Sequence, residues 1–212
     1  LGDGESRALS PDGRWAIVQT HGSPHFDVIP TGPGEAFRLQ RRGLAMIDAR
    51  WLPEERNVVV RARAKNGPAH LYVLDVRGSA VRQLTPDSIG VSAWAVSPEG
   101  ATVAVSNGPH VELFPVAGGD ARRVPVASDR WRVVGWIERG LLISENPAYG
   151  GTVIRVDTET GRRDTWADIN PQDPAGIMHL DLGGLVTTPD GRGYGYSWHR
   201  AMSDLYLVEG LV

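Results

Sequence analysis

Apolar residues in this chain occur in short runs, and each run is bounded by Gly, Pro, Asp, Asn or Ser. Runs of this kind predict β-strands joined by turns rather than helices. One phrase recurs between them. It reads Ser10-Pro11-Asp12-Gly13, then Ser97-Pro98-Glu99-Gly100, then Thr188-Pro189-Asp190-Gly191. Because Pro presets φ, Asp supplies an acceptor and Gly tolerates a positive φ, each phrase is predicted to be a hairpin turn.

Two weaker copies of the phrase fill the intervals between the strong ones. They read Leu52-Pro53-Glu54-Glu55 and Ile137-Glu138-Arg139-Gly140. The acidic positions of the five copies are therefore roughly 40 to 50 residues apart, a period typical of propeller blades. The sequence thus predicts an all-β fold, a β-propeller of four-stranded antiparallel blades, with about five blades in this chain.

The first unit shows the expected blade in full. Its strands are predicted at residues 7–9, 15–18, 26–29 and 36–39, with turns at the phrase and at 31–34. The later units repeat this order, with strands expected at 58–61, 71–74 and 81–84; at 102–105, 111–114 and 122–124; at 141–144, 153–156 and 163–166; and at 185–188, 193–197 and 205–208.

The last unit has an expected third strand at 205–208 but no fourth. Propellers commonly close their ring by letting the other terminus supply the missing strand. Leu1-Gly2-Asp3 aligns with the end of a fourth strand, as Leu84-Thr85-Pro86 does. We therefore expect residues 1–212 to form a single β-propeller domain or the C-terminal part of a larger propeller. The open edge of the last blade is expected to pair with residues upstream of Leu1 or with another chain.

Composition narrows the classes of partner. The chain is 41% hydrophobic and 22% charged, with a net charge of −3, so it can bury a core but offers no dense positive face for nucleic acid. No run approaches the roughly 20 apolar residues of a membrane helix. The absence of cysteine excludes disulfides and thiolate metal sites. We therefore expect no nucleic-acid partner and no membrane segment in this chain.

Motifs for catalysis are missing from the sequence. There is no Gly-x-Ser-x-Gly elbow, no Gly-rich phosphate loop and no calcium loop. The acids Asp12, Glu99 and Asp190 lie in the hairpin turns and are expected to be structural. We assign no catalytic residue, metal or cofactor. The alternative is the propeller lid of a prolyl-oligopeptidase-type peptidase, or a five-bladed glycosidase whose carboxylates converge on the channel.

The loops between the second and third strands of each blade contain the groups best suited to recognition. These b–c loops emerge with the d–a connections on one face, around the mouth of the central channel, whereas the a–b and c–d turns lie on the other face. Loops on a rigid scaffold are where binding residues concentrate. Residues that break the repeat there are the candidates for ligand or partner binding: His21, Tyr149, Trp198, His199 and Arg200. We expect a protein partner or a small molecule at this mouth.

Three further histidines, His25, His70 and His110, recur at one position of the blade, just before the third strand. A histidine that recurs with the repeat is expected to bond a neighbouring backbone carbonyl rather than a ligand. Three such histidines on different blades would also lie too far apart to share a metal ion. The tryptophans on the strands are expected to pack between blades, with stacking on a sugar as the minority interpretation. They are Trp15, Trp51, Trp94, Trp131, Trp136 and Trp166.

The repeat phrase and the closing stretch together resemble the TolB-like propeller repeats of bacteria. That stretch includes Gly195-Tyr196-Ser197 and Ser203-Asp204-Leu205-Tyr206-Leu207-Val208-Glu209-Gly210-Leu211. More narrowly, the chain resembles the C-terminal WD-type sensor region behind the membrane helix of some receptor-like serine/threonine protein kinases, and that of winged-helix regulators. The second and fourth units lack the full phrase, and no kinase or winged-helix motif is present. The resemblance implies a periplasmic or extracytoplasmic sensor domain that belongs to a longer signalling protein and binds a protein or small molecule.

Overall fold

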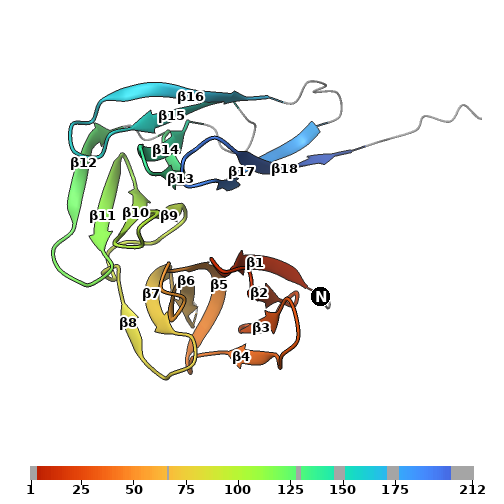
Figure 1. Cartoon of the computed structure of the whole chain (residues 1–212). Helices are drawn as coiled ribbons and strands as arrows, with labels where there is room; N and C mark the ends of the chain where they lie inside the picture. The colour runs from red at the N-terminus through yellow and green to blue at the C-terminus, as the bar shows by residue number, and fades with distance from the viewer. Residues whose placement is uncertain (1–3, 66, 128–129, 146–150, 171–176, 202–212) are drawn as a thin grey trace, which may run out of the picture.

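The computed structural model describes residues 4–65, 67–127, 130–145, 151–170 and 177–201 (Figure 1). These residues form β-strands and contain no helix. The strands make four antiparallel sheets of four strands and a fifth sheet of two strands, each sheet built from consecutive strands. Figure 1 shows the sheets following one another around a common centre in chain order, as blades do in a propeller. The predicted all-β propeller is therefore confirmed.

Each blade starts at its innermost strand and runs outward in chain order. The innermost strands of neighbouring blades lie side by side at the centre, as β1 does with β5 and β9 with β13. Blade 1 is β1 (Glu5–Leu9), β2 (Trp15–Gln19), β3 (Phe26–Pro30) and β4 (Phe37–Leu39); blade 2 is β5 (Leu44–Trp51), β6 (Asn57–Ala64), β7 (Ala69–Asp75) and β8 (Val81–Gln83). Blade 3 is β9 (Trp94–Val96), β10 (Thr102–Asn107), β11 (His110–Pro115) and β12 (Arg122–Ala127); blade 4 is β13 (Arg132–Ile137), β14 (Gly140–Ser144), β15 (Gly151–Val156) and β16 (Arg163–Ile169); the described part of blade 5 is β17 (Ile177–Thr187) and β18 (Tyr194–Arg200).

Each predicted strand overlaps an observed one wherever the structure describes the chain. The innermost strands of blades 2, 3 and 4 (β5, β9 and β13) have no range predicted from the sequence, and β17 begins at Ile177, well before the strand expected at 185–188. Most extend beyond the apolar run by one to three residues, because the hydrogen-bonded ladder continues through the polar residues that flank it. The predicted third strand of blade 5, at 205–208, and the question of what covers its edge lie outside the described residues.

Apolar side chains fill the space between neighbouring blades. Four clusters of buried residues join blade 1 to 2, 2 to 3, 3 to 4 and 4 to 5. All six tryptophans expected at these interfaces belong to or pack against the clusters, which confirms the packing prediction: Trp15, Trp51, Trp94, Trp131, Trp136 and Trp166. Trp94 and Trp131 are fully buried, each with 8% of its surface exposed, whereas the other four are only partly buried.

The a–b hairpin turns are built by the side chains that the phrase supplies. In blade 1, the Ser10 hydroxyl donates to Asp12 Oδ1 at 2.6 Å, and the Arg14 amide donates to the same oxygen at 2.9 Å. In blade 5, Thr188 and the Arg192 amide bond Asp190 in the same way, at 2.6 and 3.0 Å. The hydroxyl bonds, followed by the amide bonds, lower the pKa of both aspartates. The structural role predicted for these two acids is confirmed.

Glu99 differs from the two aspartates. Its turn has the same backbone bonds, with the Gly100 amide donating to the Ser97 carbonyl at 2.8 Å. Within the described part of the chain, however, its carboxylate accepts no hydrogen bond. A glutamate has one more methylene than an aspartate, so its carboxylate does not occupy the place from which Asp12 and Asp190 accept the turn amides. The structural role predicted for Glu99 is therefore not supported by a side-chain hydrogen bond.

The a–b turns of neighbouring blades also contact one another. Glu55 occupies the glycine position of the phrase in blade 2 with φ +60°, and its Oε1 accepts the Asp12 amide of blade 1 at 2.8 Å. A Cβ added to Gly100 of blade 3 would lie 2.3 Å from Pro53 Cδ of blade 2. In blade 4, the Glu138 amide donates to the Pro189 carbonyl of blade 5 at 2.8 Å. The phrase therefore both reverses the chain and joins adjacent blades.

Asp190→Ala is expected to lower the melting temperature, because the Thr188 hydroxyl and the Arg192 amide lose their acceptor. The pKa of Asp190 is lowered from 3.8 in the folded protein, so its stabilising contribution is fully present above that pH and is lost as the pH falls through the lower folded-state pKa. Thermal melts of wild type and variant should therefore differ by a constant amount near neutral pH and converge in strong acid.

Glu99→Ala is the matched control for this experiment. The same turn geometry surrounds Glu99, but no turn bond depends on its carboxylate. The variant should melt close to wild type at every pH. Equal losses in the two variants would mean that hydrogen bonding by the aspartate does not stabilise the turn.

Candidate functional site

The blade topology gives the molecule two faces with different chemistry. The a–b and c–d turns lie on one face, called the turn face below, and the b–c loops and d–a connections lie on the other, called the loop face. Two pockets lie between blades 1 and 2, one on each face. The wall of the loop-face pocket contains one of the binding residues predicted from the sequence.

The loop-face pocket has a volume of about 460 Å³ and is formed by the b–c loop of blade 1 together with the starts of β1 and β5. His21 lies in its wall, as expected for a b–c loop residue. The residues that line it are Glu5, Arg7, Gln19, Thr20, His21, Gly22, Ser23, Pro24, Ala45, Met46, Ile47 and Arg61. Gln19 fixes the loop, because its side-chain amide donates to the carbonyls of Ser23 and Met46 at 2.7 and 2.8 Å.

Two arginines, Arg7 and Arg61, line this pocket, and Arg50 lies beside Arg7. Arg7 forms an ion pair with Glu5 at 2.7 Å and donates to Gln19 Oε1 at 3.1 Å. Arg50 forms an ion pair with Asp48 at 2.8 Å, and its Nη1 also lies 3.4 Å from the Arg7 carbonyl oxygen. The group thus connects blade 1 to the inner strand of blade 2.

Arg61 has a buried guanidinium nitrogen without a hydrogen-bond partner. Its Nη1 donates to the Ser92 carbonyl at 2.9 Å, but its Nε is buried and has no partner. Burial is the main cause that lowers the pKa of Arg61; Asp48 raises it, and the charges of Arg50, Arg7 and Arg63 lower it further. An arginine stays protonated at physiological pH. An anion bound beside Arg61 would therefore stabilise its charged form.

The other predicted site residues are placed only in part. Trp198 is 44% exposed, and His199 is also exposed. With Arg200, these residues end strand β18 at the loop face, which corrects their expected placement in a b–c loop: the ladder with β17 continues to the pair Ile177 and Arg200. Tyr149 lies outside the described residues. No described pocket brings His21 together with the residues of blade 5.

One of the recurrent histidines, His70, has the structural role expected of the three. His70 is 6% exposed, and its Nδ1 lies 3.0 Å from the Ile89 carbonyl oxygen. His25 and His110 are half-buried near the starts of β3 and β11. The described residues contain no group of three or more His, Asp or Glu side chains that could hold a metal ion.

The sequence contained a signal for the arginines that was overlooked. Arg61 and Arg63 alternate with buried Val60 and Ala62 in β6, so two guanidinium groups lie on one side of a strand near the centre of the fold. Two like charges on one side of an otherwise apolar strand are unfavourable unless something compensates them, and they were the available signal for an anion site.

Comparison with known proteins supports the fold. No family model matches the chain, and no curated protein matches it. The chain is similar in structure to the putative TolB of Agrobacterium tumefaciens, with a TM-score of 0.64 and 15% identity over 91% of this chain and 80% of that one. It also aligns with TolB of Acinetobacter baumannii, with a TM-score of 0.42 and 23% identity over 57% of this chain, and it spans 34% of that protein. The first similarity supports a TolB-like propeller fold. The described residues include no helix long and apolar enough to cross a membrane.

His70→Ala and His21→Ala should separate a structural histidine from a surface one. The first change removes a buried partner of the Ile89 carbonyl, so we expect a loss of about 1–3 kcal/mol in the free energy of unfolding. His21 is exposed, so His21→Ala should leave urea unfolding unchanged. A loss of stability in His21→Ala as large as that in His70→Ala would contradict this assignment.

Proposed function

We propose that this propeller is a non-catalytic binding module that takes up an acidic segment of a protein partner at the loop face. The observation that supports this most strongly is the arginine group beside His21, in which Arg61 has a buried Nε without a partner. Guanidinium groups bind carboxylates through short, charge-assisted bonds. An acidic side chain in this pocket would supply the missing acceptor.

The charge balance of the group favours an anion. The charges of Arg7, Arg50 and Arg63 all act on Arg61, and the carboxylates that pair with Arg7 and Arg50 are Glu5 and Asp48. A surplus of positive charge is costly to hold together in a partly buried place unless something compensates it. The protein as a whole is negative, with a net charge of −3, so this surplus is local.

The loop face also presents groups that fit a peptide segment better than a small ion alone. The loop face presents the exposed ring of Trp198, and the exposed His199 follows it in β18. Exposed aromatic and arginine side chains are typical anchors of protein interfaces. Tyr149 and Arg200, which the sequence assigns to the same end of their blades, are proposed to extend the binding surface around the channel mouth.

The wider role proposed for the chain is that of the sensor part of a longer signalling protein outside the cytoplasm. This role rests on the resemblance of its repeats and closing stretch to the sensor propellers of receptor-like kinases and winged-helix regulators. The similarity in fold to a putative TolB is consistent with a module of this kind. The single-domain arrangement over residues 1–212, or its extension to a larger propeller, is part of the same proposal.

Arg7→Ala and Arg61→Met should each weaken the binding of a fluorescent Glu-rich peptide at least tenfold, about 1.4 kcal/mol. Methionine replaces the apolar stem of the Arg61 side chain while removing its charge. Fluorescence anisotropy at rising salt should show the wild-type affinity falling, because exposed charges are screened. Arg200→Ala tests the contribution of blade 5 in the same assay.

Arg192→Ala is the control, because Arg192 lies on the turn face with 88% of its side chain exposed. It should bind the peptide like wild type. Wild-type binding that is no tighter than that of the Arg61→Met variant, or a loss in Arg192→Ala equal to that in Arg7→Ala, would contradict a site on the loop face.

A further inference from the structure

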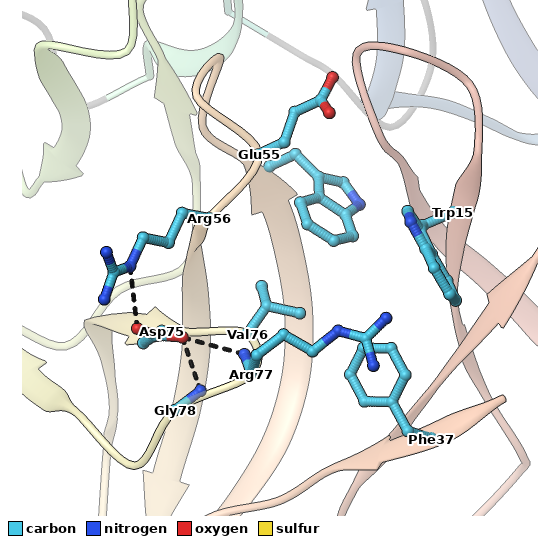
Figure 2. Close-up of a pocket in the computed structure, with 9 residues that line it drawn as sticks. Trp15, Phe37, Glu55, Arg56, Asp75, Val76, Arg77 and Gly78 are labelled. Carbon is cyan, nitrogen blue, oxygen red and sulfur yellow. Dashed lines mark hydrogen bonds and ion pairs between the residues drawn. The ribbon is translucent and has the colours of Figure 1, made fainter. Parts of the chain in front are cut away.

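A second pocket, of about 380 Å³, opens between blades 1 and 2 on the turn face (Figure 2). It lies at the opposite end of the blade interface from the arginine group. Its volume is at the small end of the range of about 300–1,000 Å³ that is usual for ligand sites. The lining residues are Trp15, Phe37, Trp51, Glu55, Arg56, Asp75, Val76, Arg77 and Gly78.

Aromatic rings from both blades form the walls of this pocket. Trp15 follows the a–b turn of blade 1, Phe37 follows the c–d turn of the same blade, and Trp51 precedes the a–b turn of blade 2. Trp15 and Phe37 meet edge to face, with centroids 5.6 Å apart and an interplanar angle of 69°. All three are only partly buried. A flat apolar group would therefore find ring surfaces on both sides.

Arg77 lies over these rings. Its Cζ is 3.7 Å from the centroid of Phe37 and 4.8 Å from that of Trp15, and Figure 2 shows its side chain reaching across the pocket from blade 2 toward the Phe37 ring of blade 1. Stacking fixes the guanidinium plane but leaves its N–H edge unused. Among the described residues, no carboxylate or carbonyl accepts a bond from this guanidinium.

The acceptors of the pocket are already engaged. Asp75 accepts the amides of Gly78 and Arg77 at 2.6 and 2.9 Å, and Nε of Arg56 at 3.1 Å. Glu55 Oε1 accepts the Asp12 amide, and Figure 2 shows this carboxylate directed away from Arg77. Trp51, in contrast, has a buried Nε1–H without an acceptor. The pocket therefore has unused donors and no unused buried acceptor.

We propose that this pocket binds a carboxylate with a flat apolar body, whose oxygens accept from Arg77 while the body packs against Trp15, Phe37 and Trp51. An aryl carboxylate or the C-terminal carboxylate of a peptide that ends in an aromatic residue has this chemistry. The site goes beyond the proposed function, because it lies on the face opposite the channel mouth. A cationic ligand is disfavoured, because Arg77 lies over the Phe37 and Trp15 rings, whereas the charge of Arg56 is paired with Asp75.

Isothermal titration with phenylacetate, compared with phenylacetamide as its neutral analogue, tests the proposal. We expect wild type to bind the carboxylate at least tenfold more tightly than the amide. Arg77→Gln should abolish this preference, and Trp51→Phe should weaken binding of the carboxylate severalfold while the fold is retained. Arg192→Ala, at an exposed position on the same face, should bind like wild type. Equal affinity for carboxylate and amide, or no effect of Arg77→Gln, would overturn the proposal.

The two sources of carboxylate are separated by a second titration with N-acetylphenylalanine and with a short peptide that ends in phenylalanine. Tighter binding of the peptide than of phenylacetate, again lost in Arg77→Gln, identifies a chain terminus as the ligand; tighter binding of phenylacetate identifies a free acid. Thermal melts of the variants confirm that they are folded. The Glu-rich peptide of the loop face should bind Arg77→Gln like wild type, so the two sites succeed or fail independently.

Discussion

Packing of one blade on the next is the interaction on which the rest of this structure depends. A four-stranded sheet has two faces, and in this chain the apolar side chains of both are buried against neighbouring blades rather than within one sheet, as the four clusters show. Val58 and Val60 of β6 face blade 1, while Val59 faces blade 3. Each blade therefore needs its neighbours, and the strands read as nearly continuous apolar runs instead of alternating ones.

Both candidate sites follow from this arrangement. Because the interface between blades 1 and 2 is filled along its length, space for a ligand remains only where the strands end, at the loop face and at the turn face. The polar groups available there are those that flank the apolar runs: Arg7 and His21 at one end, Arg77 at the other. The repeated residues form the scaffold of the blades, and residues that differ from one blade to the next contribute the polar groups that line the two pockets.

The sequence predicted most of the fold and little of the sites. Strand positions and hairpin turns follow from local rules, since the spacing of Ser10, Asp12 and Gly13 determines the turn without any distant contact. The pockets depend on which residues of different blades meet. Arg77 lies between the strands predicted at 71–74 and 81–84, and nothing near it in sequence indicates that Phe37 of another blade lies under its guanidinium. The role of Arg61 likewise requires the positions of Asp48 and Arg7.

Net charge alone does not determine which charge a binding site prefers, for a physical reason. A net charge of −3 describes the field far from the protein. At physiological salt, exposed charges that are more than about 10 Å apart are largely screened from one another. A ligand in contact with Arg61 or Arg77 experiences instead a few groups at hydrogen-bond distance, in a partly buried place where screening is weak. An acidic protein can therefore select an anionic partner, because salt screens the long-range repulsion more strongly than the short-range bonds to guanidinium groups.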